Sequence, residues 1–186
     1  MATTADIRNG LVIELDGHLR QVTYFQHVKP GKGGAFVRTK LRNVRTGAVV
    51  ERTFTSGERL NAVSLAHRPM TYSYREGDFY HFMDLQTFDD VMITGTLIGA
   101  EQLKYLLEGM EVTGLFHDDT VVLVELPQFV ELRIVETDPG VRGDTATGGT
   151  KPAKLETGAI VQVPLYIEQG IMIRVDRTED KYLTRV

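Results

Sequence analysis

The sequence contains no cysteine and no tryptophan, and none of its apolar runs approaches the roughly 18 residues that a membrane-spanning helix needs. Without cysteine, the chain can form neither disulfides nor thiolate metal sites. The five histidines lack the spacing of metal ligands and are expected on the surface or in the core, at His18, His27, His67, His81 and His117. The polar segment 1–6 has no apolar core of a secretory signal. We therefore expect a soluble cytoplasmic protein that binds no metal and no membrane.

The net charge of −4 conceals an uneven distribution. Residues 1–64 carry +5, residues 65–128 carry −8 and residues 129–186 carry −1. A basic patch on a small domain is typical of a polyanion partner, because neutralising phosphates releases counterions. An acidic middle would be repelled by the same partner, so its contacts are expected at the two ends of the chain. The alternative is that charge is distributed only for solubility.

Helical periodicity is scarce. The best helix candidates are 87–92 and 100–107, and both are too short to be stable alone. Strand-like segments are instead separated by turn signals, at Asp16-Gly17, Arg45-Thr46-Gly47, Arg75-Glu76-Gly77-Asp78 and His117-Asp118-Asp119. This regular spacing predicts an all-β protein made of small antiparallel barrels.

Two shifts in composition indicate domain boundaries. The acidic block begins after Ser64, and Pro127, which cannot donate to a central strand, separates two further strand-like segments. We predict domains at 1–64, 65–128 and 129–186. Domains of about 60 residues bury only about 60% of their surface, so each is expected to gain stability by packing against its neighbour.

A glycine-framed lysine stands between two predicted strands, in the loop Lys29-Pro30-Gly31-Lys32-Gly33-Gly34. The glycines carry no side chains that could shield Lys32, and Pro30 restricts the backbone, so the ammonium is expected to point outward. The spacing does not match a phosphate-binding loop, and strand-like residues follow it instead of a helix. The alternative is a solvated hairpin tip. On the following strand Arg38, Lys40 and Arg42 alternate with apolar residues and are predicted to contact RNA.

A second long polar loop is expected at 137–149. Loops of this length without regular structure are usually functional or disordered, and both interpretations stay open here. The functional interpretation is a phosphate site made of glycine amides and flanking cations, from Arg142, Gly143, Gly148, Gly149 and Lys151.

Several of these motifs together resemble the bacterial elongation factor P family. The resemblance covers nearly the whole chain. It is carried by the Lys29–Phe36 loop, by Phe129–Leu132 leading to Gly140–Thr145, by Lys151-Pro152-Ala153 through Glu156–Ala159 to Val161–Pro164, and by Gly170. The pattern in the last third is the most specific, because fixed Lys, Ala, Gly and Val-Pro residues recur there at the right intervals.

The resemblance implies a fold and a function. The fold is three small β-barrel domains in an L shape, an SH3-like barrel followed by two OB-folds. The function is that of a non-enzymatic translation elongation factor without a cofactor, expected to be a monomer. Such a factor binds the 70S ribosome beside peptidyl-tRNA, contacts rRNA, and relieves stalling at consecutive prolines by stimulating peptide-bond formation.

The resemblance also implies roles for particular residues. The loop Lys29, Pro30, Gly31, Lys32, Gly33 and Gly34 would enter the peptidyl-transferase centre. Lys32 would be extended by a lysine-modifying enzyme, for example by β-lysylation, although another addition or no modification also fits the sequence. Contacts with RNA on the small-subunit side are implied for Arg142, Gly143, Asp144, Thr145, Tyr182 and Arg185.

Two other functions are considered. A generic OB-fold RNA-binding protein would stack bases on aromatic side chains, taken from Phe25, Phe36, Tyr72, Tyr74, Phe79, Tyr80 and Phe82. The densest group, 72–82, lies in the acidic segment, so core packing explains it better. An enzyme is the third possibility, but the sequence shows no carboxylate pair, Ser-His-Asp set or metal cluster.

Overall fold

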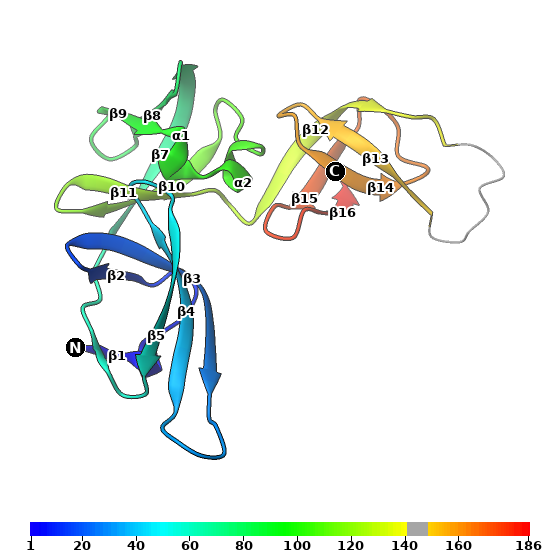
Figure 1. Cartoon of the computed structure of the whole chain (residues 1–186). Helices are drawn as coiled ribbons and strands as arrows, with labels where there is room; N and C mark the ends of the chain where they lie inside the picture. The colour runs from blue at the N-terminus through cyan, green and yellow to red at the C-terminus, as the bar shows by residue number, and fades with distance from the viewer. Residues whose placement is uncertain (141–148) are drawn as a thin grey trace. The chain divides into compact units, whose positions relative to one another are not determined.

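The computed structural model describes residues 1–140 and 149–186 and consists mainly of β-strands (Figure 1). Within these residues the only helices are α1 (Gly95–Ile98), α2 (Ala100–Leu103) and the 3-10 turn η1 (Thr4–Asp6). The predicted all-β fold is confirmed. None of the described helices has the length and apolar character needed to cross a membrane.

The residues group into two compact units. The first comprises Met1–Arg68, Ile93–Gly99 and Gly114–Val124. The second comprises Pro69–Met92, Ala100–Thr113 and Glu125–Val186. The division into three domains after residues 64 and 128 stays a prediction.

The first unit contains a four-stranded antiparallel sheet in sequential order, built from β2 (Val12–Leu15), β3 (His18–Val28), β4 (Phe36–Asn43) and β5 (Val49–Thr55). The turn between β2 and β3 has positive φ at Asp16 (53°) and Gly17 (76°), as expected from that residue pair. Two successive positive φ values match the right-handed twist of the flanking strands. The short strands β1 (Ala2–Thr3) and β6 (Arg59–Leu60) pair with each other.

Strand β4 shows how the sequence divides core from surface. Val37 and Leu41 are 1% and 0% exposed, whereas Arg38 and Lys40 are exposed. Successive side chains of a strand point to opposite faces, so this alternation puts one face of β4 in the core and the other in solvent. Each fully buried aliphatic side chain contributes about 1.5–3 kcal/mol, which fixes the register of the strand.

A five-stranded sheet follows in the order β11-β10-β7-β8-β9. Its strands are β7 (Ala66–Glu76), β8 (Phe79–Asp84), β9 (Asp90–Thr94), β10 (Glu111–His117) and β11 (Thr120–Glu125). The helix candidate at 87–92 is wrong, because β9 begins at Asp90. The second candidate, 100–107, is helical only as far as Leu103.

The aromatic residues of this sheet are only partly core residues. Tyr72 and Phe82 are 6% and 0% exposed, and their ring centroids lie 5.3 Å apart. The core interpretation is confirmed for these two residues. Tyr74 and Phe79 are about half exposed, so that interpretation is wrong for them.

His81 joins three strands of the second unit. Its Nδ1 atom lies 2.9 Å from Asp90 Oδ2, and its Nε2 atom lies 3.3 Å from Glu76 Oε2. Its ring stacks on Tyr74, with centroids 4.3 Å apart. The hydrogen bond to Asp90 raises the pKa of His81, and the Glu76 carboxylate adds to this, although burial acts in the opposite direction. The imidazolium form therefore stabilises this part of the fold.

The stability contributed by His81 is expected to depend on pH. Because its pKa is raised in the folded chain, the contribution is fully present below the unfolded value of about 6.5 and is lost as the pH rises through the folded value. We expect His81→Gln to lower the melting temperature more at pH 5.5 than at pH 8.5, measured by thermal unfolding in matched buffers. An equal decrease at both pH values would contradict the ionic role.

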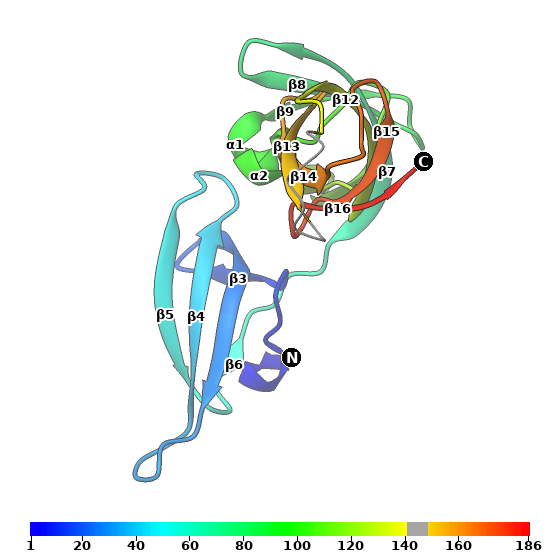
Figure 2. The same ribbon diagram turned by 90° about the vertical axis from the view of Figure 1, so that its right-hand side faces the viewer.

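The last third of the chain forms a closed barrel in the order β12-β13-β14-β16-β15 (Figure 2). Its strands are β12 (Phe129–Thr137), β13 (Thr150–Leu155), β14 (Ile160–Pro164), β15 (Met172–Asp176) and β16 (Lys181–Arg185). On β12 the alternate residues Val130, Leu132 and Ile134 are 0–3% exposed and face the barrel interior. Closure leaves no free sheet edge in this barrel.

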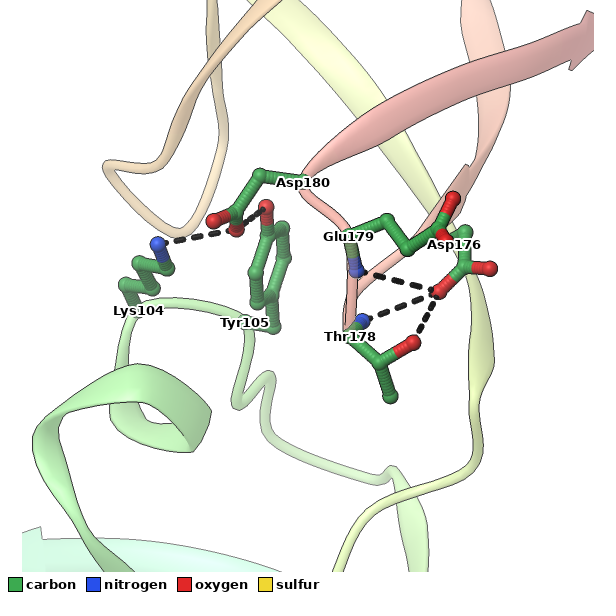
Figure 3. A network of polar contacts seen from close by, with 6 residues as sticks. All are labelled: Lys104, Tyr105, Asp176, Thr178, Glu179 and Asp180. Atoms are coloured by element: carbon green, nitrogen blue, oxygen red, sulfur yellow. Dashed lines mark hydrogen bonds and ion pairs between the residues drawn. The ribbon is translucent and has the colours of Figure 1, made fainter. Parts of the chain in front are cut away.

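A polar cluster connects the segment after α2 with the turn between β15 and β16 (Figure 3). One carboxylate oxygen of Asp180, Oδ1, accepts a hydrogen bond from the Tyr105 hydroxyl at 2.5 Å and lies 2.8 Å from Lys104 Nζ. The Tyr105 side chain is fully buried. These bonds lower the pKa of Asp180, with Lys104 as the larger cause. We call Lys104, Tyr105 and Asp180 the tyrosine clamp.

The same turn is shaped by a buried carboxylate. Asp176 Oδ1 accepts hydrogen bonds from the backbone N–H groups of Thr178 (2.9 Å) and Glu179 (3.3 Å) and from the Thr178 hydroxyl (2.6 Å). These bonds lower the pKa of Asp176. Arg177 then reaches the preceding linker, where its guanidinium donates to the carbonyls of Leu126 (2.6 Å) and Pro127 (2.7 Å). The segment immediately before Asp180 is therefore held in place by its own hydrogen bonds.

Candidate nucleic-acid interface

The predicted lysine loop connects β3 to β4, two of the longest strands of the first unit. The last pair of the hairpin is Val28↔Phe36, so residues 29–35 form the connection. The connection projects past the ends of the neighbouring strands in both views (Figures 1 and 2). A long paired hairpin is a stiff support, so the loop is held at a defined place on a rigid base.

Lys32 lies at an open position. All six residues of the loop from Lys29 to Gly34 are exposed. A Cβ atom added at Gly31, Gly33 or Gly34 would meet no atom within 4 Å. Gly33 has φ +103°, which only glycine adopts readily. In the described part of the chain no carboxylate forms an ion pair with Lys32, so its ammonium is available for an external acceptor.

A basic face lies on the sheet that carries this loop. We define it by Tyr24, Arg38 and Lys40, whose side chains share one face of the adjacent strands β3 and β4. They line a hollow of about 290 Å³ together with Gln26, Thr39, Glu51, Arg52 and Thr53. The Lys40 ammonium lies 5.7 Å from the centre of the Tyr24 ring. Cations beside an exposed aromatic ring suit both phosphate and base contacts of RNA.

Arg42 shares one face of β4 with Arg38 and Lys40 but is held by contacts within the chain, and its predicted contact with RNA stays a prediction. Its Nη2 atom donates a 2.6 Å hydrogen bond to the carbonyl of Thr96, and its guanidinium lies against Gly99. The bond holds Arg42 against the segment around α1, within the first unit. Arg52 on β5 pairs with Thr39, and its guanidinium lies over the Phe54 ring and 3.9 Å from Asp16 Oδ2, so its side chain is on the opposite face of the sheet.

The predicted contacts of the C-terminal barrel are described only in part. Arg142, Gly143, Asp144 and Thr145 lie outside the described residues, as does Gly148. Tyr182 and Arg185 both lie on β16.

Tyr166 is a residue that sequence reasoning missed. Burial raises the pKa of Tyr182, and a side-chain hydrogen bond with Tyr166 adds to the shift. Tyr166 is 71% exposed. Tyr166 and Tyr182 are 16 residues apart in the chain, so the local sequence contained no signal of their contact.

The role predicted for Lys151 is also corrected by the structure. The sequence suggested a cation at the edge of a phosphate site, but Lys151 is only 6% exposed. Its Nζ atom donates a 2.5 Å hydrogen bond to the carbonyl of Asp138. The bond links the two ends of the connection between β12 and β13, so the role of Lys151 is structural.

The groups brought together here are binding groups. No group of three or more His, Cys, Asp or Glu side chains among the described residues could hold a metal ion. The exposed lysine and the basic face can bind and orient an anionic partner.

Comparison with family models matches the chain along most of its length. Residues 3–60 match the elongation factor P KOW-like domain, residues 65–124 match the elongation factor P OB domain, and residues 130–185 match the elongation factor P C-terminal domain. The family consists of translation factors and is not classed as an enzyme family.

Individual relatives agree with the family models. The chain is 50% identical over 186 residues to elongation factor P from Caldicellulosiruptor saccharolyticus, covering 100% of both chains. It is 54% identical over 185 residues to elongation factor P from Microcystis aeruginosa, again covering 100% of both. Among solved structures, it resembles a eukaryotic translation initiation factor 5A from Methanococcus jannaschii, with a TM-score of 0.50 and 20% identity over 68% of this chain and 90% of that one. The last similarity concerns the fold alone. With three family models matched in order and full-length relatives at half identity, the chain belongs to the elongation factor P family of translation elongation factors.

Proposed function

We propose that the chain binds the 70S ribosome in the cytoplasm, beside peptidyl-tRNA, and relieves stalling at consecutive prolines. The observation that carries the proposal is the position of Lys32, exposed at the end of a projecting hairpin whose sheet bears a basic face. In this proposal the basic face and the C-terminal residues Tyr182 and Arg185 contact RNA. Lys32 reaches the peptidyl-transferase centre.

The physical basis is orientation. Proline has a constrained φ and is a poor nucleophile, so peptidyl transfer stalls when its substrates are badly placed. Correct placement of two reactants can lower a reaction barrier by up to about 7–11 kcal/mol. Lys32 then needs no proton transfer, because an ammonium held against sugar and phosphate oxygens is enough to restrain the tRNA end. The chemistry itself stays with the ribosome.

A covalent extension of Lys32 is part of the proposal. The open space around the loop glycines leaves room for a lysine-modifying enzyme to approach the amine. Addition of an amine-bearing group such as β-lysine would lengthen the cationic arm. An added mass on Lys32 in protein purified from its own host, located by peptide mass spectrometry, would identify the type of group.

Charge reversal on the basic face tests the RNA contact. We expect Arg38→Glu and Lys40→Glu together to weaken ribosome binding strongly. The slope of log affinity against log salt should fall by about 1.4 to 1.8, because each of the two lost phosphate contacts removes about 0.7 to 0.9. The measurement is ribosome binding between 50 and 200 mM salt.

Arg45→Glu provides the matched control, because Arg45 is exposed in the turn between β4 and β5 and lies outside the basic face. It should leave the slope nearly unchanged. A double variant with the salt slope of the original chain would remove this face from the proposed interface.

A further inference from the structure

Phe88 has an unfavourable backbone conformation and an unburied side chain. Its φ is +62°, in the left-handed region that bulky residues avoid. The other non-glycine residues with positive φ in the described chain are all aspartates, at Asp16, Asp118, Asp119 and Asp180. The Phe88 side chain is 72% exposed. Phenylalanine therefore costs stability at this position and gains no compensating burial within the chain.

The connection that carries Phe88 is tightly held. Asp84 is 1% exposed, and its Oδ1 atom accepts hydrogen bonds from the backbone N–H groups of Gln86 (2.8 Å) and Thr87 (3.3 Å). The Phe88 N–H itself donates to the Asp84 carbonyl at 2.7 Å. These bonds impose the turn and fix the backbone from which the aromatic ring projects. Strain maintained in this way is typical of functional positions.

Further apolar side chains are exposed on the adjoining strands. We define the apolar patch as Tyr74, Phe79, Met83, Phe88 and Met92, which are 37–72% exposed. Phe79 and Met83 share one face of β8 with His81, since strand residues alternate. Tyr74 pairs with His81 across the sheet, and Phe88 lies in the connection that follows β8. Exposed aromatic and methionine side chains gathered on one face are typical of protein-binding surfaces.

The charge around the patch selects the kind of partner. Glu76, Asp89 and Asp90 border it and are exposed, and these three carboxylates outnumber the single His81 imidazolium that pairs with two of them. Residues 65–128 carry −8 overall. RNA phosphates would be repelled. A second copy of the chain, docking patch to patch, would bring like charges together. The complementary surface is a protein with an apolar pocket bordered by lysine and arginine.

We propose that the apolar patch, with Phe88 as its anchor, docks onto a basic protein of the ribosome. The proposal rests on the proposed ribosome binding, since ribosomes present both RNA and RNA-binding proteins, and the acidic border favours the proteins. An aromatic anchor seated in a pocket would explain why phenylalanine occupies this position despite its backbone strain.

Phe88→Gly separates this role from a structural one. Glycine relieves the positive φ, so the melting temperature should rise by about 2–4 °C. Affinity for purified 70S ribosomes should nevertheless fall at least about tenfold, because an aromatic anchor is lost. A variant that loses binding while gaining stability cannot be explained by misfolding. Ile160→Ala, which removes an apolar side chain 64% exposed on β14, is the control and should leave the affinity within about twofold.

Photo-crosslinking identifies what the patch contacts. A benzophenone amino acid at position 88 of the full chain, irradiated with purified 70S ribosomes, should label a protein of high lysine and arginine content. Labelling of rRNA or of a second copy of the chain would overturn the proposal, as would no labelling at all. Unchanged ribosome affinity of Phe88→Gly would overturn it too, while leaving the proposed function intact. If the unaltered chain did not bind ribosomes, both proposals would fail.

Discussion

Lys32→Ala is expected to abolish rescue of a consecutive-proline reporter while leaving folding unchanged. The side chain is exposed and its neighbouring glycines leave open space around it, so its removal breaks no described contact. Surface changes of this kind usually alter the free energy of unfolding by less than about 0.5 kcal/mol. If Lys32 supplies even about 3 kcal/mol of orientation in the peptidyl-transferase centre, its loss slows the step by more than about 100-fold.

Lys32→Arg distinguishes charge from amine chemistry. Arginine keeps the positive charge, but its planar guanidinium replaces the compact primary amine that a lysine-modifying enzyme needs. If the extended amine is required, the arginine variant should fail like the alanine variant. If charge alone is sufficient, it should restore synthesis. The readout is full-length product from a proline-rich message in a reconstituted translation system lacking other rescue factors.

The control for both variants is Lys154→Ala, which removes an exposed lysine from β13. It should support rescue like the unaltered chain. Ribosome occupancy must be matched for all variants, so that weakened binding is not mistaken for a lost catalytic contribution. Full rescue by Lys32→Ala at equal occupancy would contradict the proposed mechanism and favour a solvated loop tip.

Features encoded by neighbouring residues were predictable from the sequence. The pair Asp16-Gly17 predicts a tight hairpin turn because both positions tolerate positive φ, and the structure has that turn. Alternation from Val37 to Leu41 predicts a strand with one buried face, which β4 confirms. The exposed Lys32 loop follows from its glycines and from the strands on either side.

Features that depend on distant partners could not be predicted. Arg42 lies in a basic alternating strand, and only the fold brings it to the Thr96 carbonyl, 54 residues away. The pattern that suggested an exposed Lys151 contains no sign of its hydrogen bond to Asp138. Phe88 lies in a turn where the sequence suggested a short helix. The turn could not be predicted, because the Asp84 carboxylate that imposes it is placed only once β8 has packed.

The tyrosine clamp is the clearest case of such long-range information. Tyr105 and Asp180 are 75 residues apart in the chain and join the segment after α2 to the turn between β15 and β16 (Figure 3). Nothing in either local sequence indicates the pairing. A buried phenol needs a hydrogen-bond partner, however, and burial together with Asp180 raises the pKa of Tyr105, so its hydroxyl stays protonated and donates.

Removal of the Asp180 carboxylate is expected to be costly because it leaves the buried Tyr105 hydroxyl without its acceptor. We expect Asp180→Gly to lower the free energy of unfolding by about 1–3 kcal/mol at pH 7, the usual cost of an unsatisfied buried polar group. Glycine accommodates the φ of +55° at this position, so backbone strain does not add to the loss. Asp180→Asn, which also tolerates that φ and keeps a side-chain oxygen, should lose less.

Tyr105→Phe tests the cause of the loss. Added to Asp180→Gly, it removes the orphaned hydroxyl, so the double variant should be as stable as Asp180→Gly alone or more stable. In the original chain the same change should cost only about 0.5–1.5 kcal/mol, the net value of one hydrogen bond. The measurement is the urea unfolding midpoint of the four chains at constant m-value. Losses that simply add in the double variant would show that Tyr105 and Asp180 stabilise the fold independently.

The stability contributed by Asp180 should also depend on pH. Because the pKa of Asp180 is lowered in the folded chain, its contribution to the free energy of unfolding should persist above the unfolded value of about 3.9 and disappear as the pH falls through the folded value.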